Sequence, residues 1–150
     1  MTPTGGRATV HADAAAIYAA EDHAAATVPL RRFGRFADIE AHVVRLTTSS
    51  WWDDRFPGAP VEVEVHRRSH SATVSCSTID PDRVGLIALV DGRGWGLETV
   101  LHELAHVAAG IGAGHGDRFR RALLDLWRHD AGVQAWAALE SALAEHPVPR

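Results

Sequence analysis

Two histidines and a glutamate have a spacing that suits metal chemistry. His102 and His106 are four residues apart, and Glu103 directly follows the first of them, in an H-E-x-x-H pattern. Residues four apart on an α-helix lie one above the other, so both imidazoles can present a ring nitrogen to one metal ion. Glu103 lies beside them and can take a proton from a water molecule bound to that ion. The pattern predicts a metal centre with an adjacent general base.

A catalytic zinc site usually has three protein ligands and one open position, so a third ligand is expected. His115 follows His106 nine residues later, and the glycine-rich link 110–114 supplies permissive backbone for turning the chain back. Asp117 and Glu98 are the rival third ligands, although Glu98, one turn before the first histidine, is better placed beside the site or facing substrate. We expect His115 to complete the set and Zn²⁺ to be the metal, while three imidazoles also suit cobalt, nickel or iron.

The elements around this motif can be read from hydrophobic periodicity. A helix is expected over 97–109, with Gly110 as its C-terminal stop. The apolar run 84–90 is typical of a buried strand, and the strict alternation over 60–67 is typical of a half-exposed one. A weaker third strand is expected over 71–76. The metal-binding helix should therefore directly follow a small sheet.

Helices are expected on both sides of the strands, because alanine-rich segments and apolar residues at helical spacing flank them. Four such helices are predicted, over 11–27, 36–50, 117–130 and 133–145. Residues 1–10 are expected to be flexible, and the aromatic-rich segment 51–58 is expected to be a loop. The order of elements predicts an α+β domain with N-terminal helices, a small, mostly antiparallel sheet, an active-site helix and C-terminal helices.

Length and composition limit the class of protein. The chain has 150 residues, of which 46% are hydrophobic and 23% charged, which fits one globular domain over residues 1–150. Cys76 is the only cysteine, so neither an internal disulfide nor a cysteine-based zinc finger can form. The formal net charge of −4 argues against a dedicated nucleic-acid binder, which needs a basic surface.

The sequence also bears on where the protein is expected to act. Its first residues lack the charged-then-apolar pattern of a signal peptide, and no stretch approaches the length of a transmembrane helix. A single cysteine suits a reducing compartment. We expect a cytoplasmic protein with no membrane partner. Its substrate and oligomeric state are not encoded in these patterns.

Hydrolysis also requires stabilisation of an oxyanion, so other side chains are candidates for a role beside the metal. Tyr18, the single tyrosine, lies in the first expected helix and is interpreted as a packing residue. His66 and His70 flank the turn after the first strand and are interpreted as solvated. Trp95 immediately precedes the metal-binding helix and is a candidate to line a pocket.

The motif residues carry a resemblance to a known class. The segment 102–106, followed by H-G-D-R-F at 115–119, resembles the zincin metallopeptidases. It is most similar to their SprT-like branch, in which H-E-x-x-H is followed at a distance by H-G-x-x-F or H-G-x-x-W. The small size and the early segment 17–21 also resemble a family of small metallohydrolases from bacteria with GC-rich genomes. The strong match covers residues 96–127.

The resemblance implies a zincin-like fold with His102, His106 and His115 as zinc ligands and Glu103 as general base. It also implies that a strand near the cleft can pair with an extended peptide. We therefore expect a zinc-dependent hydrolase, specifically a metallopeptidase that uses a metal-activated water on a peptide or protein substrate. The chain departs from the metzincin pattern, whose third histidine comes sooner and whose Met-turn needs a downstream methionine, because its sole methionine is Met1.

Two alternatives remain open at the level of the sequence. The domain could be a non-catalytic, metal-stabilised module that binds a peptide without cutting it. It could instead be a nucleoprotein-associated protease of the SprT type, for which steep salt dependence of DNA binding would be diagnostic. The net charge of −4 and the lack of a cysteine zinc ribbon argue against the second alternative.

Overall fold

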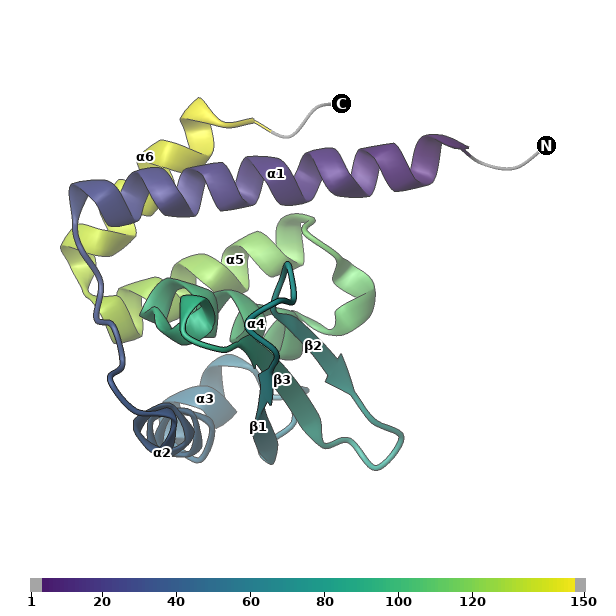
Figure 1. Ribbon diagram of the computed structural model, residues 1–150, viewed down its shortest axis with the longest axis vertical. Helices are drawn as coiled ribbons and strands as arrows, with labels where there is room; N and C mark the ends of the chain where they lie inside the picture. The colour runs from purple at the N-terminus through teal and green to yellow at the C-terminus, as the bar shows by residue number, and fades with distance from the viewer. Residues whose placement is uncertain (1–3, 148–150) are drawn as a thin grey trace.

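The computed structural model describes residues 4–147 and shows an α+β fold (Figure 1). The helices and strands follow in the order α1 (Thr4–Thr27), α2 (Phe36–Thr47), α3 (Ser50–Arg55), β1 (Val63–Arg68), β2 (Cys76–Ile79), β3 (Gly85–Val90), α4 (Leu97–Ala109), α5 (Asp117–Leu126) and α6 (Val133–Glu145). Short 3-10 turns cover Arg93–Trp95 and Ile111–Ala113, and a π-helical turn covers Trp127–Ala131. The predicted helix 97–109 and the predicted final helix 133–145 are both confirmed.

The three-stranded sheet is mixed, with the order β1-β3-β2, so the expectation of a mostly antiparallel sheet is only half right. β3 pairs in parallel with β1 and antiparallel with β2. After β1 the chain returns along β2, which does not pair with β1. The turn at 80–84 then leads into β3, which lies between the two. Because β3 is central, its apolar run is buried, which agrees with the pattern expected for it.

The second strand lies later in the chain than the predicted 71–76. Side chains of two arginines hydrogen-bond to carbonyls in this segment, Arg68 to Val74 and Arg93 to Ala72. Those carbonyls are therefore satisfied without a β-ladder. The ladder with β3 begins only at Cys76.

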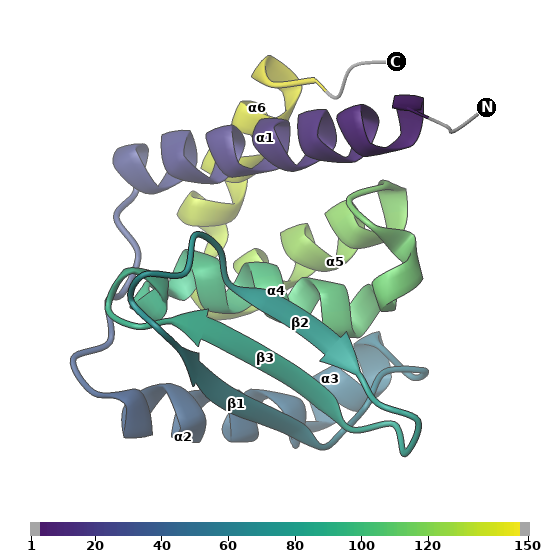
Figure 2. The ribbon, with the colours of Figure 1, turned by 45° about the vertical axis from the view of Figure 1, so that its right-hand side comes forward.

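The helices α4 and α5 lie behind the sheet in Figure 2, while the sheet's other face is turned toward the viewer. The face toward α4 includes Val63, Ile87 and Leu89, all buried, as expected for a sheet covered on one side. On the opposite face, β1 presents the exposed side chains of Glu64 and His66. The sheet thus serves as a one-sided support for the helix that carries the H-E-x-x-H motif.

The first helix begins at Thr4, earlier than the predicted start at residue 11, and residues 1–3 lie outside the described residues. The flexibility expected for residues 1–10 stays a prediction. Once a helix is nucleated, extending it adds one hydrogen bond per residue, and the alanine-rich segment favours extension. The buried side chains of Ile17, Ala20 and Ala24 anchor the C-terminal half. α1 runs beside α6 and crosses above α4 and α5 (Figures 1 and 2).

The predicted loop at 51–58 instead begins with the short helix α3. Ser49 provides its N-cap, because the Ser49 hydroxyl accepts a hydrogen bond from the backbone N–H of Trp52 at 3.2 Å. Trp52 is fully buried, and its indole N–H donates to the carbonyl of Pro60 at 3.0 Å. Trp52 therefore belongs to the core, and the half-buried Trp51 and Phe56 pack against it.

The helix after the metal motif is also shorter than the predicted 117–130, because α5 ends at Leu126 and changes to a π-helical turn. That turn places Asp130 2.6 Å from the Nε2 atom of His42 on α2. No helix within residues 4–147 is both long and apolar enough to cross a membrane.

Candidate metal centre

The helix α4 is buried along most of its length, which fixes the orientation of its motif residues. His102 and Glu103 are only 1% and 2% exposed, and Leu101 and Leu104 between the sheet and the other helices are fully buried. A polar pair at such depth requires compensating interactions. The packing of α4 therefore holds these two side chains in a low-dielectric setting.

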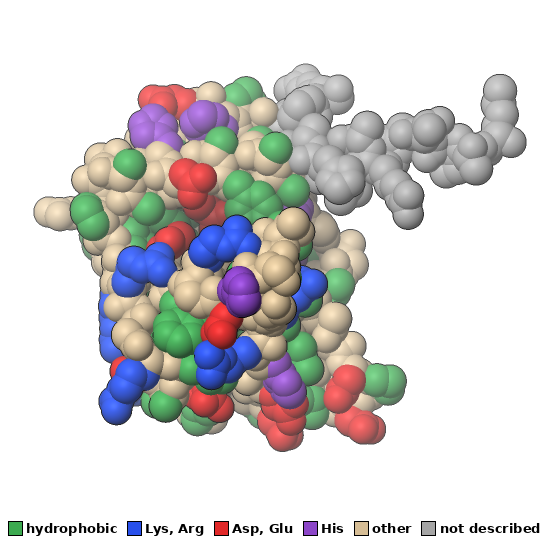
Figure 3. Space-filling model, in the orientation of Figure 1, with side chains coloured by type: hydrophobic (Ala, Val, Ile, Leu, Met, Phe, Trp, Pro, Cys, Tyr) green, Lys and Arg blue, Asp and Glu red, His purple; other side chains and the backbone are tan. Residues whose placement is uncertain are grey.

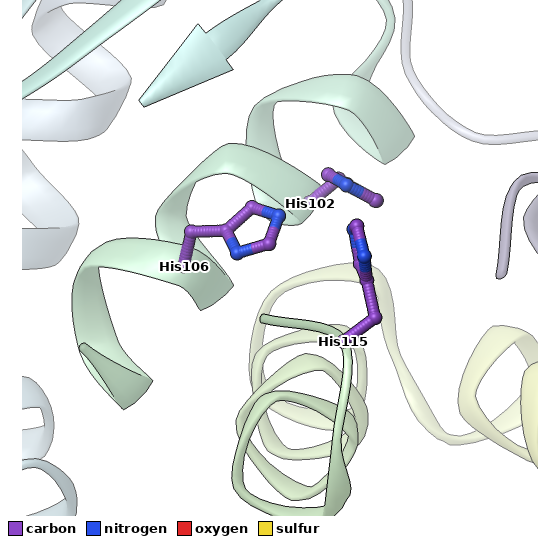
Figure 4. A group of neighbouring side chains, drawn as sticks. All are labelled: His102, His106 and His115. Carbon is purple, nitrogen blue, oxygen red and sulfur yellow. The ribbon is translucent and has the colours of Figure 1, made fainter. Parts of the chain in front are cut away.

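Three imidazoles converge beside this helix (Figure 4). His102 and His106 extend from successive turns of α4, and His115 approaches from the segment before α5. One ring nitrogen from each lies within 4.8 Å of the others. Ring centroids are 5.1 Å apart for His102 and His106, 5.4 Å for His102 and His115, and 4.7 Å for His106 and His115. Three nitrogen donors therefore face a common point.

Glycines turn the chain back between the second and third histidines. Gly110 caps α4 with φ 90° and ψ 137°, and Gly114 has φ 56° and ψ −131°. Both conformations strain residues with a Cβ atom. The intervening 3-10 turn completes the reversal, which is how His115 reaches the helix it follows.

Phe119 forms an apolar floor beneath the three rings. It is fully buried, and its ring centroid lies 5.1 Å from that of His102, 4.4 Å from that of His106 and 4.9 Å from that of His115. Contacts of this kind restrict imidazole rotation and exclude water from one side of the cluster. Phe119 is the last residue of the H-G-D-R-F segment, so the structure assigns that position a packing function.

Glu21 of α1 contacts His102, and no local sequence pattern indicates this role. Its Oε1 atom lies 2.7 Å from Nδ1 of His102, and the Glu21 side chain is buried. Burial raises the pKa of Glu21, an effect that the nearby His102 partly offsets. For His102, burial works against protonation, but the carboxylate of Glu21 outweighs it and raises the pKa. A carboxylate bound to Nδ1 leaves Nε2 of His102 free to face the other two rings.

Tyr18, interpreted from the sequence as a packing residue, packs directly against the centre. Its ring stacks on that of His102 with centroids 4.8 Å apart and planes 12° apart. Partial burial and the charges of Glu103 and Glu21 raise its pKa to about 12, so its hydroxyl remains a hydrogen-bond donor at neutral pH. Tyr18 and Glu21 lie three residues apart on one face of α1.

Glu103 is suited to accept a proton. Burial raises its pKa, while His102, a hydrogen bond with Ser77 and the charge of Arg68 act in the opposite direction. Its Oε2 atom is buried without a hydrogen-bond partner in the described part of the chain. A carboxylate with a raised pKa and an uncommitted oxygen matches the properties of a general base.

The other two histidines are kept neutral in the metal-free protein. Burial, followed by the neighbouring His102 and His115, lowers the pKa of His106 to about 3. Burial and His102 likewise lower the pKa of His115 to about 4. A neutral imidazole can donate a nitrogen lone pair to a metal without first losing a proton.

The donor set fits a zinc ion. The Nε2 atoms of His102 and His115 are buried and have no hydrogen-bond partner in residues 13–147, a costly state unless a ligand satisfies them. Two nitrogens each about 2.0–2.1 Å from zinc can be at most about 4.2 Å apart. The three nitrogen atoms lie within 4.8 Å of one another in the structure. Small rotations of the side chains can close the remaining gap. Three imidazoles with one open position are typical of catalytic zinc.

The rival third ligands lie outside the cluster. The carboxylate of Glu98 is folded over Gly96 at the start of α4, where a Cβ atom on that glycine would collide with it. Asp117 is exposed in the first turn of α5 and is not part of the three-histidine group. Of the three candidates for a third ligand, only His115 therefore lies beside His102 and His106.

A cavity of about 410 Å³ opens beside Glu103. Tyr18 and Asp22 of α1 line one side, while Arg93 and Thr99 line another. Trp95, the candidate pocket residue, packs against the core and does not line it, whereas its neighbour Gly94 does. The cavity gives a ligand access to the carboxylate of Glu103.

Comparisons of the chain with protein-family models, with curated proteins and with solved structures found no match.

Proposed function

We propose that this protein is a zinc-dependent hydrolase of the zincin type, that its substrate is a peptide bond, and that Glu103 is its general base. The observation that carries the proposal is the convergence of His102, His106 and His115 beside the buried Glu103. The resemblance of the 102–106 and 115–119 segments to SprT-like zincins supports the choice of a peptide substrate.

When bound, zinc would polarise a substrate carbonyl and lower the pKa of water toward about 7. Glu103 would accept the proton released as water attacks the carbonyl and would return it to the departing amine. Its raised pKa makes this carboxylate a stronger base than an ordinary glutamate. Tyr18, with its hydroxyl protonated, can donate a hydrogen bond near the same cavity.

The test is the substitution Glu103→Gln in zinc-loaded protein. We expect zinc content to remain at the wild-type level, because Glu103 is not one of the three nitrogen donors. We expect cleavage of a mixed-sequence, fluorescence-quenched peptide library to fall by about 10²–10⁴-fold, the typical contribution of a positioned base. Metal content is measured by plasma mass spectrometry and cleavage by fluorescence.

Glu98→Gln is the matched control, because Glu98 lies on the same helix but its carboxylate is folded over Gly96. This variant should retain cleavage. Unchanged cleavage in Glu103→Gln would exclude the assigned base. Zinc-loaded wild-type protein that binds library peptides but cleaves none would instead favour a non-catalytic peptide-binding module.

A further inference from the structure

A second cavity, of about 580 Å³, lies at the C-terminal end of α4, and none of the three histidines lines it. Its walls come from the end of α4, from α5, from the segment after α3 and from the turn between β2 and β3. The volume lies within the range of about 300–1,000 Å³ typical of small-molecule sites. The cavity is thus large enough to hold a ligand independent of the metal centre.

Four arginines line this cavity, namely Arg55, Arg83, Arg118 and Arg121. Arg55 is neutralised, because its guanidinium lies 2.7 Å from the carboxylate of Asp125. Arg118 and Arg121 form no salt bridge with any residue between 13 and 147. Both project from α5, three residues apart and therefore from the same side of the helix.

Arg83 adds a third uncompensated positive charge. Its guanidinium donates a hydrogen bond to the backbone carbonyl of Gly58, which holds the side chain in place across the cavity without neutralising it. The residue has φ 62°, the single positive φ among the described non-glycine residues. A non-glycine residue in this conformation is uncommon and costs free energy.

This concentration of charge contrasts with the rest of a chain whose net charge is −4. Arg35 pairs with Asp38 at 3.0 Å, and Arg67 pairs with Asp91 at 2.8 Å. On the face shown in Figure 3, basic and acidic side chains lie interspersed. At the second cavity, by contrast, three guanidinium groups that are unpaired among residues 13–147 line one concave surface. Its one acidic lining residue, Asp125, is already paired with Arg55.

The cavity floor is apolar between these charges, with Phe56, Ile79, Val107 and Ala122 among its lining residues. A guanidinium group presents a planar set of donors that matches the oxygens of phosphate or carboxylate. We propose that this cavity binds a small molecule that carries a phosphate or carboxylate group on an apolar body. Arg118 and Arg121 contact the anionic group, and the apolar floor contacts the remainder.

The experiment uses full-length protein stripped of metal and freed of chelator, so that an anion cannot bind through zinc. Inorganic phosphate and succinate are titrated separately at low ionic strength by calorimetry, and the Nε–H signals of the arginines are followed by NMR. We expect saturable binding of at least one probe, with shifts of the Arg118 and Arg121 signals. Tighter binding of phosphate identifies a phosphorylated ligand, and tighter binding of succinate identifies a carboxylate.

The double variant Arg118→Gln with Arg121→Gln should weaken that binding by about tenfold or more, because hydrogen bonds to charged groups are the strong ones. The control double variant, Arg31→Gln with Arg45→Gln, removes the same charge from positions outside the cavity and should leave binding within about twofold. Equal losses in both variants would overturn the proposal, as would the absence of saturable binding in the millimolar range. Either outcome would mean that the arginines only complement the carbonyl end of α4.

Discussion

A single carboxylate determines which nitrogen of His102 can face the candidate metal centre. Glu21 accepts a hydrogen bond from Nδ1 at 2.7 Å, so the remaining nitrogen, Nε2, is directed toward His106 and His115. Partners of this kind orient the ring and raise its basicity as a ligand. The buried Glu21 is therefore a positioning residue for the centre, although it contacts no ion itself.

We predict that Glu21→Gln weakens zinc binding by about tenfold and Glu21→Ala by up to about 100-fold, the range found for such partners. Glutamine can still accept the hydrogen bond from Nδ1 but lacks the charge, whereas alanine lacks both. Competition with a chromophoric zinc chelator measures the affinities. Asp22→Asn is the control, because Asp22 is exposed and its side chain is not bonded to His102. Wild-type affinity in both Glu21 variants would refute the positioning role.

At the scale of single residues, the contacts of Glu21 and Tyr18 with His102 could not be predicted from local sequence patterns. Glu21 and His102 are separated by 81 positions, and nothing local indicates that α1 passes over α4. A weak signal does exist, since Glu21 lies four residues after the buried Ile17 and three before the buried Ala24. An acidic residue on an apolar helical face requires a partner, but its identity depends on the tertiary fold.

At the scale of elements, local periodicity predicted the parts of the chain that carry their own signal. The apolar spacing of 97–109 and its glycine stop were sufficient to define α4, and the uninterrupted apolar run predicted the central β3. The parallel pairing of β1 with β3 could not be predicted, because the sequence does not show that β3 lies between the two earlier strands. Helical hydrogen bonds join near neighbours, whereas strand pairing joins segments whose distance in sequence varies.

The turn after α4 leads to a prediction about backbone conformation. Gly110 has φ 90°, and no atom lies within 4 Å of the position a Cβ atom would take. The cost of Gly110→Ala is therefore purely conformational, and we expect the free energy of unfolding to fall by about 1–3 kcal/mol. Zinc affinity should fall as well, because the altered turn displaces His115 from His106.

Gly112→Ala is a matched control in the same loop. Its Cβ atom would also meet nothing within 4 Å, but the residue does not have a positive φ. This substitution should leave stability unchanged or raise it by about 0.4–1 kcal/mol, because alanine restricts the unfolded chain. Urea unfolding compares the two variants. Equal effects at positions 110 and 112 would show that the backbone conformation of Gly110 does not govern this loop.

At the scale of the whole molecule, the candidate centre lies where α1 passes over α4. α1 supplies Glu21 and Tyr18, α4 supplies His102 and Glu103, and α1 is itself held against α6. The sheet supports α4 from one side while Phe119 closes the other. Packing of the domain therefore buries His102 and partly buries His106 and His115, and their protonation is linked to folding.

The sign of that link follows from the lowered pKa values of His106, to about 3, and His115, to about 4. In the unfolded chain both have a pKa near about 6.5. Above that pH both states are neutral at these residues and there is no effect. Below it, the unfolded chain binds two protons that the metal-free folded protein excludes, until the folded pKa values are reached. The contribution of these two residues to stability therefore decreases as the pH falls from about 6.5 toward 4.

We test this contribution by urea unfolding of two metal-free proteins, the wild type and the double variant His106→Gln with His115→Gln. Between pH 6.5 and pH 5, the free energy of unfolding of the wild type should fall relative to that of the variant, because the variant lacks the two groups responsible. His102, Glu21 and Glu103 contribute with the opposite sign, since their raised pKa values favour the folded state at low pH, but they are present in both proteins. Parallel pH profiles for the two metal-free proteins would contradict the burial of neutral imidazoles at this centre.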